Sequence, residues 1–122
     1  MQITRETSNS NLILAVEQER IRIGAQWYTG NLIVTADEIV SDWAPVDPAC
    51  VTLADLAPAL ALEPELVIIG AGNEPATPDI DLMAELGARA IGLEFMQTAA
   101  ACRTFNVLVH ERRRVAAALI LG

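Results

Sequence analysis

Two glycines that follow an apolar segment are the first residues of this chain whose spacing suggests chemistry. Gly70 and Gly72 come at the end of an expected strand, and Glu94 ends the next expected strand about 22 residues later. This spacing is similar to that of a dinucleotide-binding unit, in which backbone amides bind a pyrophosphate and an acidic side chain binds a ribose. Pro75 replaces the third glycine of that motif, and the next helix is expected to begin only near Pro78. The pattern therefore favours a tight turn over a nucleotide site.

A polar group of side chains occurs in the otherwise aliphatic last third of the chain: Glu94, Thr98, Asn106 and Glu111. The carboxyl end of a strand is where open α/β sheets place their sites. Glu94 is there either a general acid or base, or a carboxylate near the amides that open the next helix, where it stabilises the helix by about 0.3–1 kcal/mol. Thr98, Cys102 and Asn106 are spaced by four residues and share one helical face.

The chain has few residues that could act as nucleophiles or metal ligands. His110 is the only histidine, and at a helix exit it stabilises the helix terminus as readily as it catalyses. Cys50 and Cys102 lie far apart without a CxxC spacing, which excludes structural zinc. Cys102 is expected to be a small buried residue, since no second histidine is present to activate it. We predict no catalytic set, no metal and no cofactor.

The charge balance limits the partners of the chain. Its formal net charge is -8, so nucleic acid and anionic membrane surfaces should repel it. Arg112, Arg113 and Arg114 are a local exception, but in a strand their side chains would alternate between faces and form no shared patch. The longest apolar run, 115–121, is far shorter than the roughly 20 residues of a membrane span. The N-terminus shows no export or transit pattern, so we expect a cytoplasmic protein.

The elements that must position these residues begin with strands. The first third contains short segments with β-branched or aromatic residues, at 11–16, 20–28, 31–35 and 38–43. Gly30 and Asn31 form a plausible hairpin turn. The proline-rich stretch 44–48 supports neither a helix nor a central strand and predicts a loop.

Helices are expected after this loop. Thr52 and Asp55 are placed as an N-cap and its partner three residues later for a helix over 53–62, which Pro58 shortens or kinks. A second helix is expected to start at a Thr77 cap with Pro78 in its first position and to stop at Gly87. Thr98 is expected to cap a third, which ends near Val109.

Strands expected at 65–69, 88–94 and 115–121 alternate with these last two helices, so the C-terminal half is predicted to be β-α-β-α-β. Strands joined by helices are normally parallel neighbours with right-handed crossovers. We therefore predict one three-layer α/β domain over residues 1–122, with a mixed central sheet to which the N-terminal β segments are added.

Three stretches carry a resemblance to a known family: 92–98 (GLEFMQT), 101–106 (ACRTFN) and 111–119 (ERRRVAAAL). With 66–72 (LVIIGAG) before them, the chain resembles the domain of unknown function 498/598 family, whose eukaryotic relatives include a mitochondrial respiratory complex I assembly factor. The resemblance implies a three-layer α/β fold with a mixed sheet, and no established enzymatic activity, cofactor or metal. The recurrent polar positions of the family map to Glu94, Thr98, Asn106, Glu111 and Arg113.

The chain also departs from the family pattern. Arg112 stands where the family often has glycine, Gln97 where an aspartate is common, and Phe105 where tyrosine is usual. A binding role borrowed from the family therefore does not extend to these three positions.

Two functions compete on this reading. The first is a non-catalytic interaction or assembly domain that binds an unidentified protein partner through a surface near Gly70, Glu94 and the start of the third helix. The alternative is a small-molecule-binding domain or enzyme with a site near Gly70–Gly72, in which Glu94 is the acid or base and Arg113 binds an anionic group. Glu111 and Arg113 are alternatively an internal ion pair or part of a homodimer contact.

Overall fold

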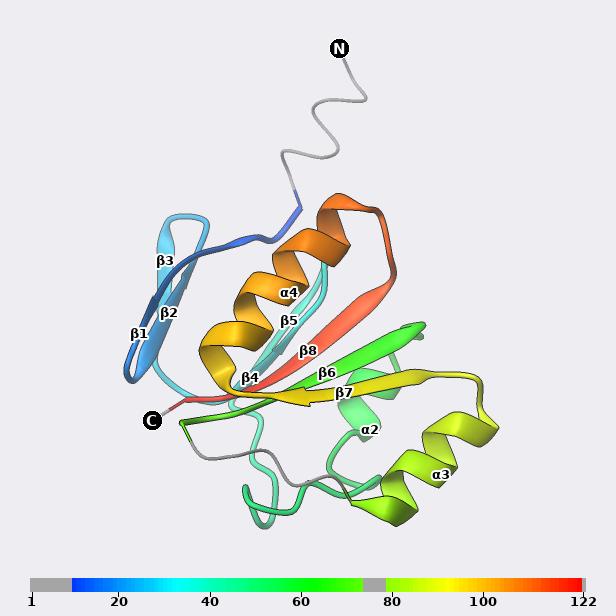
Figure 1. Cartoon of the computed structure of the whole chain (residues 1–122). Helices are drawn as coiled ribbons and strands as arrows, with labels where there is room; N and C mark the ends of the chain where they lie inside the picture. Colours follow the sequence, from blue (N-terminus) through cyan, green and yellow to red (C-terminus); the bar gives the residue numbers. More distant parts are fainter. Residues whose placement is uncertain (1–9, 74–78, 122) are drawn as a thin grey trace.

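The computed structural model of the chain describes residues 10–73 and 79–121 (Figure 1). Its helices are α2 (Ala57–Leu60), α3 (Ile80–Ala88) and α4 (Thr98–His110). Its strands are β1 (Ile13–Glu17), β2 (Arg20–Ile23), β3 (Gln26–Tyr28), β4 (Leu32–Val34), β5 (Ile39–Ser41), β6 (Leu66–Ala71), β7 (Gly92–Met96) and β8 (Val115–Ile120).

The central sheet has the strand order β5-β4-β8-β6-β7. β6 runs parallel to both β7 and β8, whereas β4 runs antiparallel to β8 and to β5. The sheet is therefore mixed, and the predicted β-α-β-α-β order of the C-terminal half is confirmed. β6 and β8 read as continuous apolar runs because both of their faces are covered.

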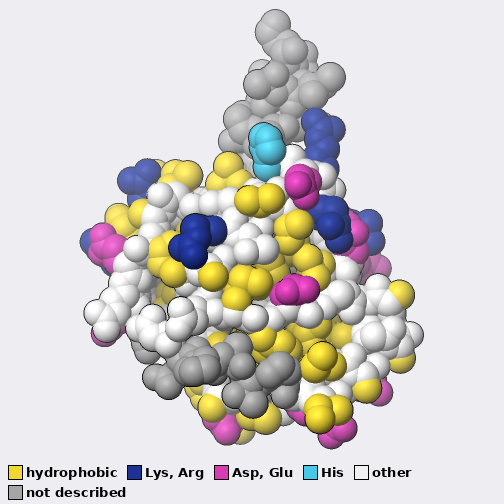
Figure 2. Space-filling model, viewed as in Figure 1, with side chains coloured by type: hydrophobic (Ala, Val, Ile, Leu, Met, Phe, Trp, Pro, Cys, Tyr) yellow, Lys and Arg dark blue, Asp and Glu magenta, His cyan; other side chains and the backbone are white. Residues whose placement is uncertain are grey.

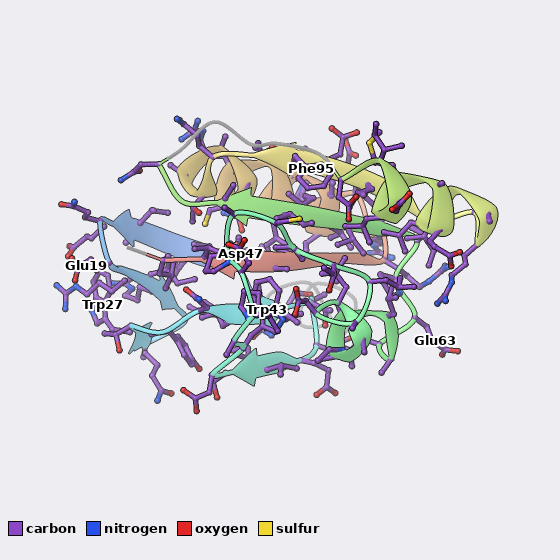
Figure 3. All side chains as sticks on the ribbon, turned by 90° about the horizontal axis from the view of Figure 1, so that it is seen from below. Glu19, Trp27, Trp43, Asp47, Glu63 and Phe95 are labelled. Carbon is purple, nitrogen blue, oxygen red and sulfur yellow. The ribbon has the colours of Figure 1, made fainter. Side chains whose placement is uncertain are left out.

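The central sheet is the middle of three layers, as predicted. α4 and the small sheet β1-β2-β3 cover one face, and α2, α3 and the loop after β5 cover the other (Figure 1). Phe105 of α4 is fully buried between this helix and the central sheet. Trp43 anchors the loop on the opposite face, where its Nε1 donates to the Asp55 carbonyl at 2.8 Å. Figure 3 shows Trp43 lying over the strands of the central sheet on this side.

The placement of the first three strands corrects the prediction. β1, β2 and β3 pair with one another in a separate antiparallel sheet and do not join the central one. The segment 20–28 is not one strand, because Gly24 adopts a φ of 61° and turns the chain back between β2 and β3. Gly30 and Asn31 do not form a hairpin turn, since they connect the two sheets. The Asn31 side chain instead accepts a hydrogen bond from the Leu121 backbone at 2.8 Å.

The predicted Thr52–Asp55 pair forms, but the first helix begins at Ala57 and not at residue 53, with Leu56 as its N-cap, and it is shorter than predicted. Thr52 and Asp55 exchange hydrogen bonds, with Thr52 N donating to Asp55 Oδ2 at 2.9 Å and Asp55 N donating to Thr52 Oγ1 at 3.3 Å. The helix that follows has only four residues and carries Pro58 in its first turn. The preceding residues form turns, because a proline ring is tolerated only at the beginning of a helix.

The boundaries of α3 also differ from the prediction. Asp79 is its N-cap and accepts a hydrogen bond from Asp81 N at 3.1 Å. The predicted Thr77 cap and Pro78 lie outside the described residues. Gly87 does not stop the helix, which continues to Ala88.

Candidate functional site

Gly70 lies within β6, one residue before the strand ends at Ala71, and not in the following loop as expected. A Cβ atom at Gly70 would lie 3.1 Å from the Thr98 Cα and 3.2 Å from the Ala101 Cβ. It would also lie 2.9 Å from a methyl carbon of Leu119. The glycine therefore lets α4 approach the sheet closely.

Thr98 connects the end of β6, the end of β8 and the start of α4 by hydrogen bonds, and it is not the N-cap of α4. Its hydroxyl accepts a hydrogen bond from Gly72 N at 2.8 Å and donates one to the Ile120 carbonyl at 2.7 Å. Its own backbone N donates to the Gly72 carbonyl at 3.0 Å. The N-cap position belongs to Gln97, whose side chain makes no capping bond and donates instead to the Asn73 carbonyl at 3.0 Å. Gly72 turns the chain here with a φ of 74°.

A hollow of about 250 Å³ opens at this end of the sheet, and we call it the Gly72–Thr98 hollow. It is lined by Val16, Glu17, Gln18, Gly72, Asn73, Thr98, Ala99, Ile120 and Leu121. β6 and β8 are parallel and end here, so this is the edge at which the sequence pattern expected a site. No sequence pattern indicates that β1 contributes to the lining of this hollow, because the sequence does not show that β1 lies against α4.

Asn106 connects α4 to β1. Its Oδ1 accepts a hydrogen bond from Ile13 N at 2.9 Å, and its Nδ2 donates to the Ile13 carbonyl at 2.8 Å. The side-chain amide thereby makes the two hydrogen bonds to Ile13 that a neighbouring strand would otherwise make on the open edge of β1. The structure gives Asn106 a part in the fold, at mid-helix and away from the hollow.

Glu94 lies in the middle of β7, which extends to Met96 and is an edge strand of the central sheet. The neighbouring Leu93 and Phe95 pack on the α3 side, so the Glu94 side chain lies on the α4 side. It is exposed, and no other described residue shares a hydrogen bond or an ion pair with its carboxylate. The structure does not bring Glu94 to the Gly72–Thr98 hollow.

Glu111 and Arg113 do not form an ion pair, which was one of the alternatives from the sequence. Both are exposed in the turn after α4, and Arg113 Nε pairs with Glu65 Oε2 at 3.2 Å instead. Glu65 Oε1 also accepts a hydrogen bond from Arg114 N at 2.9 Å. This backbone hydrogen bond lowers the pKa of Glu65, partial burial opposes the shift, and the Arg113 guanidinium adds to the lowering.

A second and larger cavity, of about 550 Å³, lies at this opposite end of α4. We call it the arginine cavity, and it is lined by Ser10, Thr35, Ala36, Asp37, Leu62, Pro64, Val109, Arg112, Arg113, Arg114 and Val115. The sequence prediction of alternating arginines is wrong here, because the three residues lie in a turn before β8 begins at Val115. All three border the same cavity.

The structure therefore divides the predicted residues between two ends of one helix. Gly70, Gly72 and Thr98 gather at the start of α4, and Glu111 and Arg113 follow its end. A helix of 13 residues is roughly 20 Å long, so one small ligand does not contact both groups.

The side chains capable of nucleophilic or metal chemistry are not assembled into a centre. Cys102 is buried, and burial raises the pKa of its thiol to about 12, with Arg103 opposing weakly. His110 is exposed at the last position of α4. Within residues 10–73 and 79–121, no three His, Cys, Asp or Glu side chains are grouped as metal ligands. None of the helices described has the length and apolar character needed to cross a bilayer.

These features define a three-layer α/β domain with two surface hollows. The side chains of Thr98 and Asn106 are hydrogen-bonded to backbone groups of neighbouring segments. The chain belongs to the family described as protein of unknown function DUF498/DUF598, whose model matches residues 13–120. The expected family membership is confirmed.

Three proteins are similar to this chain over most of its length. The "13 kDa major membrane protein" of Francisella tularensis is 28% identical over 94 residues, which cover 76% of each chain. The "NADH dehydrogenase (ubiquinone) 1 alpha subcomplex assembly factor 3" of Danio rerio is 29% identical over 118 residues, covering 95% of this chain and 67% of the relative. An NMR structure of a Xanthomonas campestris protein is 34% identical with a TM-score of 0.81, covering 93% of this chain and 86% of that one.

Proposed function

We propose that this chain is a non-catalytic, cytoplasmic protein-binding domain that takes part in assembling a larger protein complex. The chemistry of the Gly72–Thr98 hollow carries the proposal. The Thr98 hydroxyl and the Gly72 amide in its lining are already hydrogen-bonded to each other. Glu17, the titratable residue of the lining, is paired with Arg20 at 2.7 Å. Such a surface supplies shape and fixed polar groups but no free acid or base, which suits binding better than catalysis.

The size of the hollow supports a protein partner. Pockets for small ligands usually measure about 300–1,000 Å³, and the Gly72–Thr98 hollow has about 250 Å³. A hollow of that size accepts a side chain of a partner, as the buried anchor residues of protein interfaces require.

Exposed apolar side chains on β1 and α4, two elements that line the hollow, extend this surface. Leu14 and Val16 of β1 are 54% and 40% exposed, and Val107 of α4 is 56% exposed. The Asn106–Ile13 hydrogen bonds hold these two elements side by side, so the apolar residues face solvent on one side of the domain. Figure 2 shows hydrophobic side chains on the face that α4 presents. An apolar patch with a polar surround is typical of a protein interface.

The name of one relative supports a class of partner. A family member that covers most of this chain is named as an assembly factor of a respiratory complex. By analogy, the partner is a subunit of a multi-subunit complex, bound while that complex is being built.

The test is capture of partners from the native host with a tagged chain. Ala99→Arg places a long charged side chain in the hollow from an exposed position in the first turn of α4. Its matched control is Ile80→Arg, since Ile80 is 80% exposed in the first turn of α3 on the other face. We expect wild type and Ile80→Arg to retain subunits of one complex and Ala99→Arg to lose them, with unchanged circular dichroism. Equal capture by all three chains contradicts the proposed surface.

A further inference from the structure

The arginine cavity is a concave site formed by segments that lie far apart in the sequence. The α4–β8 turn supplies Arg112, Arg113 and Arg114, the β4–β5 turn supplies Thr35 to Asp37, and the segment before β6 supplies Leu62 and Pro64. Its volume of about 550 Å³ falls within the range of small-molecule sites. Figure 2 shows basic side chains gathered near the turn that joins α4 to β8.

The conformation of Arg112 is unusual for an arginine. Its φ is 63°, in the left-handed region that glycine occupies most easily after a helix. The turn is held by hydrogen bonds from Arg112 N to the Val109 carbonyl and from Arg113 N to the Leu108 carbonyl, each at 2.9 Å. A non-glycine residue in this region costs roughly 1–2 kcal/mol. An arginine at a position that suits glycine points to a use for its side chain.

The guanidinium groups keep donors for a ligand. Arg113 uses its Nε on Glu65 at 3.2 Å, and Arg114 uses its Nε on the Glu63 carbonyl at 3.3 Å. The Glu63 side chain itself points away from the domain (Figure 3). Among the described residues no acceptor is paired with the terminal amino groups of either arginine, or with any guanidinium nitrogen of Arg112. A guanidinium has five N–H donors, so these groups match an oxyanion.

The local charge is opposite to that of the whole chain. Three arginines line the cavity against one carboxylate, Asp37, while Glu65 is engaged by Arg113 and the Arg114 backbone. The chain as a whole has a net charge of -8, which repels large polyanions such as nucleic acid. Among the described residues, Arg113 is the one arginine of the three with a carboxylate partner, so the charges of Arg112 and Arg114 are left for a ligand. The site therefore favours a small anion.

We propose that the arginine cavity binds a small organic molecule through a doubly charged oxyanion group, either a phosphate or a pair of carboxylates. Arg112 and Arg114 hold the charged group. The apolar side chains of Leu62, Val109 and Val115 contact the remainder of the ligand. This site is separate from the protein-binding hollow, and its loss would leave that proposed function intact.

The test follows the backbone amides of the full chain by NMR while sodium phosphate or sodium succinate is added, with sodium chloride at equal ionic strength as the reference. We expect saturable shifts at residues 35–37 and 112–115 with one of the two anions, which identifies the charged group. Absence of saturation with both, or the same shifts with chloride, overturns the proposal.

Two variants localise the effect. Arg112→Gly removes one guanidinium and relieves the left-handed backbone, so it should remain folded and bind about tenfold more weakly. Arg103→Ala removes an exposed arginine of α4 that does not line the cavity and should bind like wild type. Wild-type binding by Arg112→Gly contradicts the assignment, because that chain keeps the turn and lacks the donor.

Discussion

The side chain of Asn106 forms hydrogen bonds with both the amide and the carbonyl of Ile13, at 2.9 and 2.8 Å, across 93 positions of sequence. This pair fixes the small N-terminal sheet against α4. It also places Val16 at the rim of the Gly72–Thr98 hollow. A residue that resembled a site residue in the sequence therefore acts by positioning the elements that form one.

Asn106→Ala should destabilise the domain by about 2–3 kcal/mol, because it leaves both polar groups of the buried Ile13 backbone without partners. Urea denaturation measures this change, and amide exchange at Ile13 should become faster than in wild type. Asn73→Ala, at an exposed position, is the control and should change stability by less than about 0.5 kcal/mol. Equal stability of both variants would show that the small sheet is held by its apolar contacts alone.

Thr98→Val keeps the shape of the side chain and removes the hydroxyl that connects Gly72 to Ile120. The buried Gly72 amide then lacks an acceptor, so we expect a loss of about 2–3 kcal/mol in unfolding free energy. Thr98→Ser retains the hydroxyl and should lose only about 1 kcal/mol, from one methyl group. Chemical denaturation compares the two, and a larger loss in the serine variant contradicts the role of the hydroxyl.

The C-terminal half of the fold follows from the sequence because its signals are local. β6 and β8 are continuous apolar runs, and α4 places Cys102 and Phe105 on one buried face. The separate sheet of β1 to β3 was not predictable from such patterns. Its strands are short, and whether they join the central sheet depends on contacts such as Asn106 with Ile13 that no local pattern reveals.

The candidate sites were predictable to a similar degree. A strand end next to a helix start located Gly72 and Thr98, although not their mutual hydrogen bond. Arg113 was singled out, but its partner Glu65 was not, since it is 48 residues away in sequence. The arginine cavity was missed because the expected strand alternation does not apply in a turn. The one available signal was Arg112 itself, at a position where the family often has glycine.

Gly70→Ala should destabilise the domain by about 1–3 kcal/mol, because the added Cβ meets the α4 backbone at 3.1 Å and cannot be accommodated by a side-chain rotation. Gly87→Ala is the matched control. Nothing lies within 4 Å of a Cβ there, and the helical position favours alanine, so stability should rise by about 0.5–1 kcal/mol. Opposite signs in thermal denaturation support the close approach of α4, and equal signs contradict it.

The two cysteines should differ in reactivity. Burial raises the pKa of Cys102 to about 12, so its reactive thiolate is scarce at pH 8, whereas Cys50 is exposed. Iodoacetamide added to the native chain at pH 8 should give one adduct, which peptide mass spectrometry places at Cys50. In denaturant both residues should react. Rapid modification of native Cys102 would revive it as a candidate nucleophile.

Glu65 should make stability depend on pH in the acid range. Its pKa is lowered in the folded chain, chiefly by the Arg114 backbone hydrogen bond, so the folded state releases this proton more readily than the unfolded state. The resulting stabilisation is present above the ordinary value of 4.5 and is lost as the pH falls through the lowered folded value. Glu65→Gln cannot ionise and lacks this contribution at every pH.

We therefore expect wild type to be more stable than Glu65→Gln at pH 7 and the difference to shrink as the pH falls below 4.5. Urea denaturation of both chains across the acid range measures it. Repeating the series at about 1 M salt separates the two contributions, because salt screens the exposed Arg113 ion pair far more than the backbone hydrogen bond. A difference that stays constant with pH would show that the Glu65 side chain acts through its shape and not through its charge.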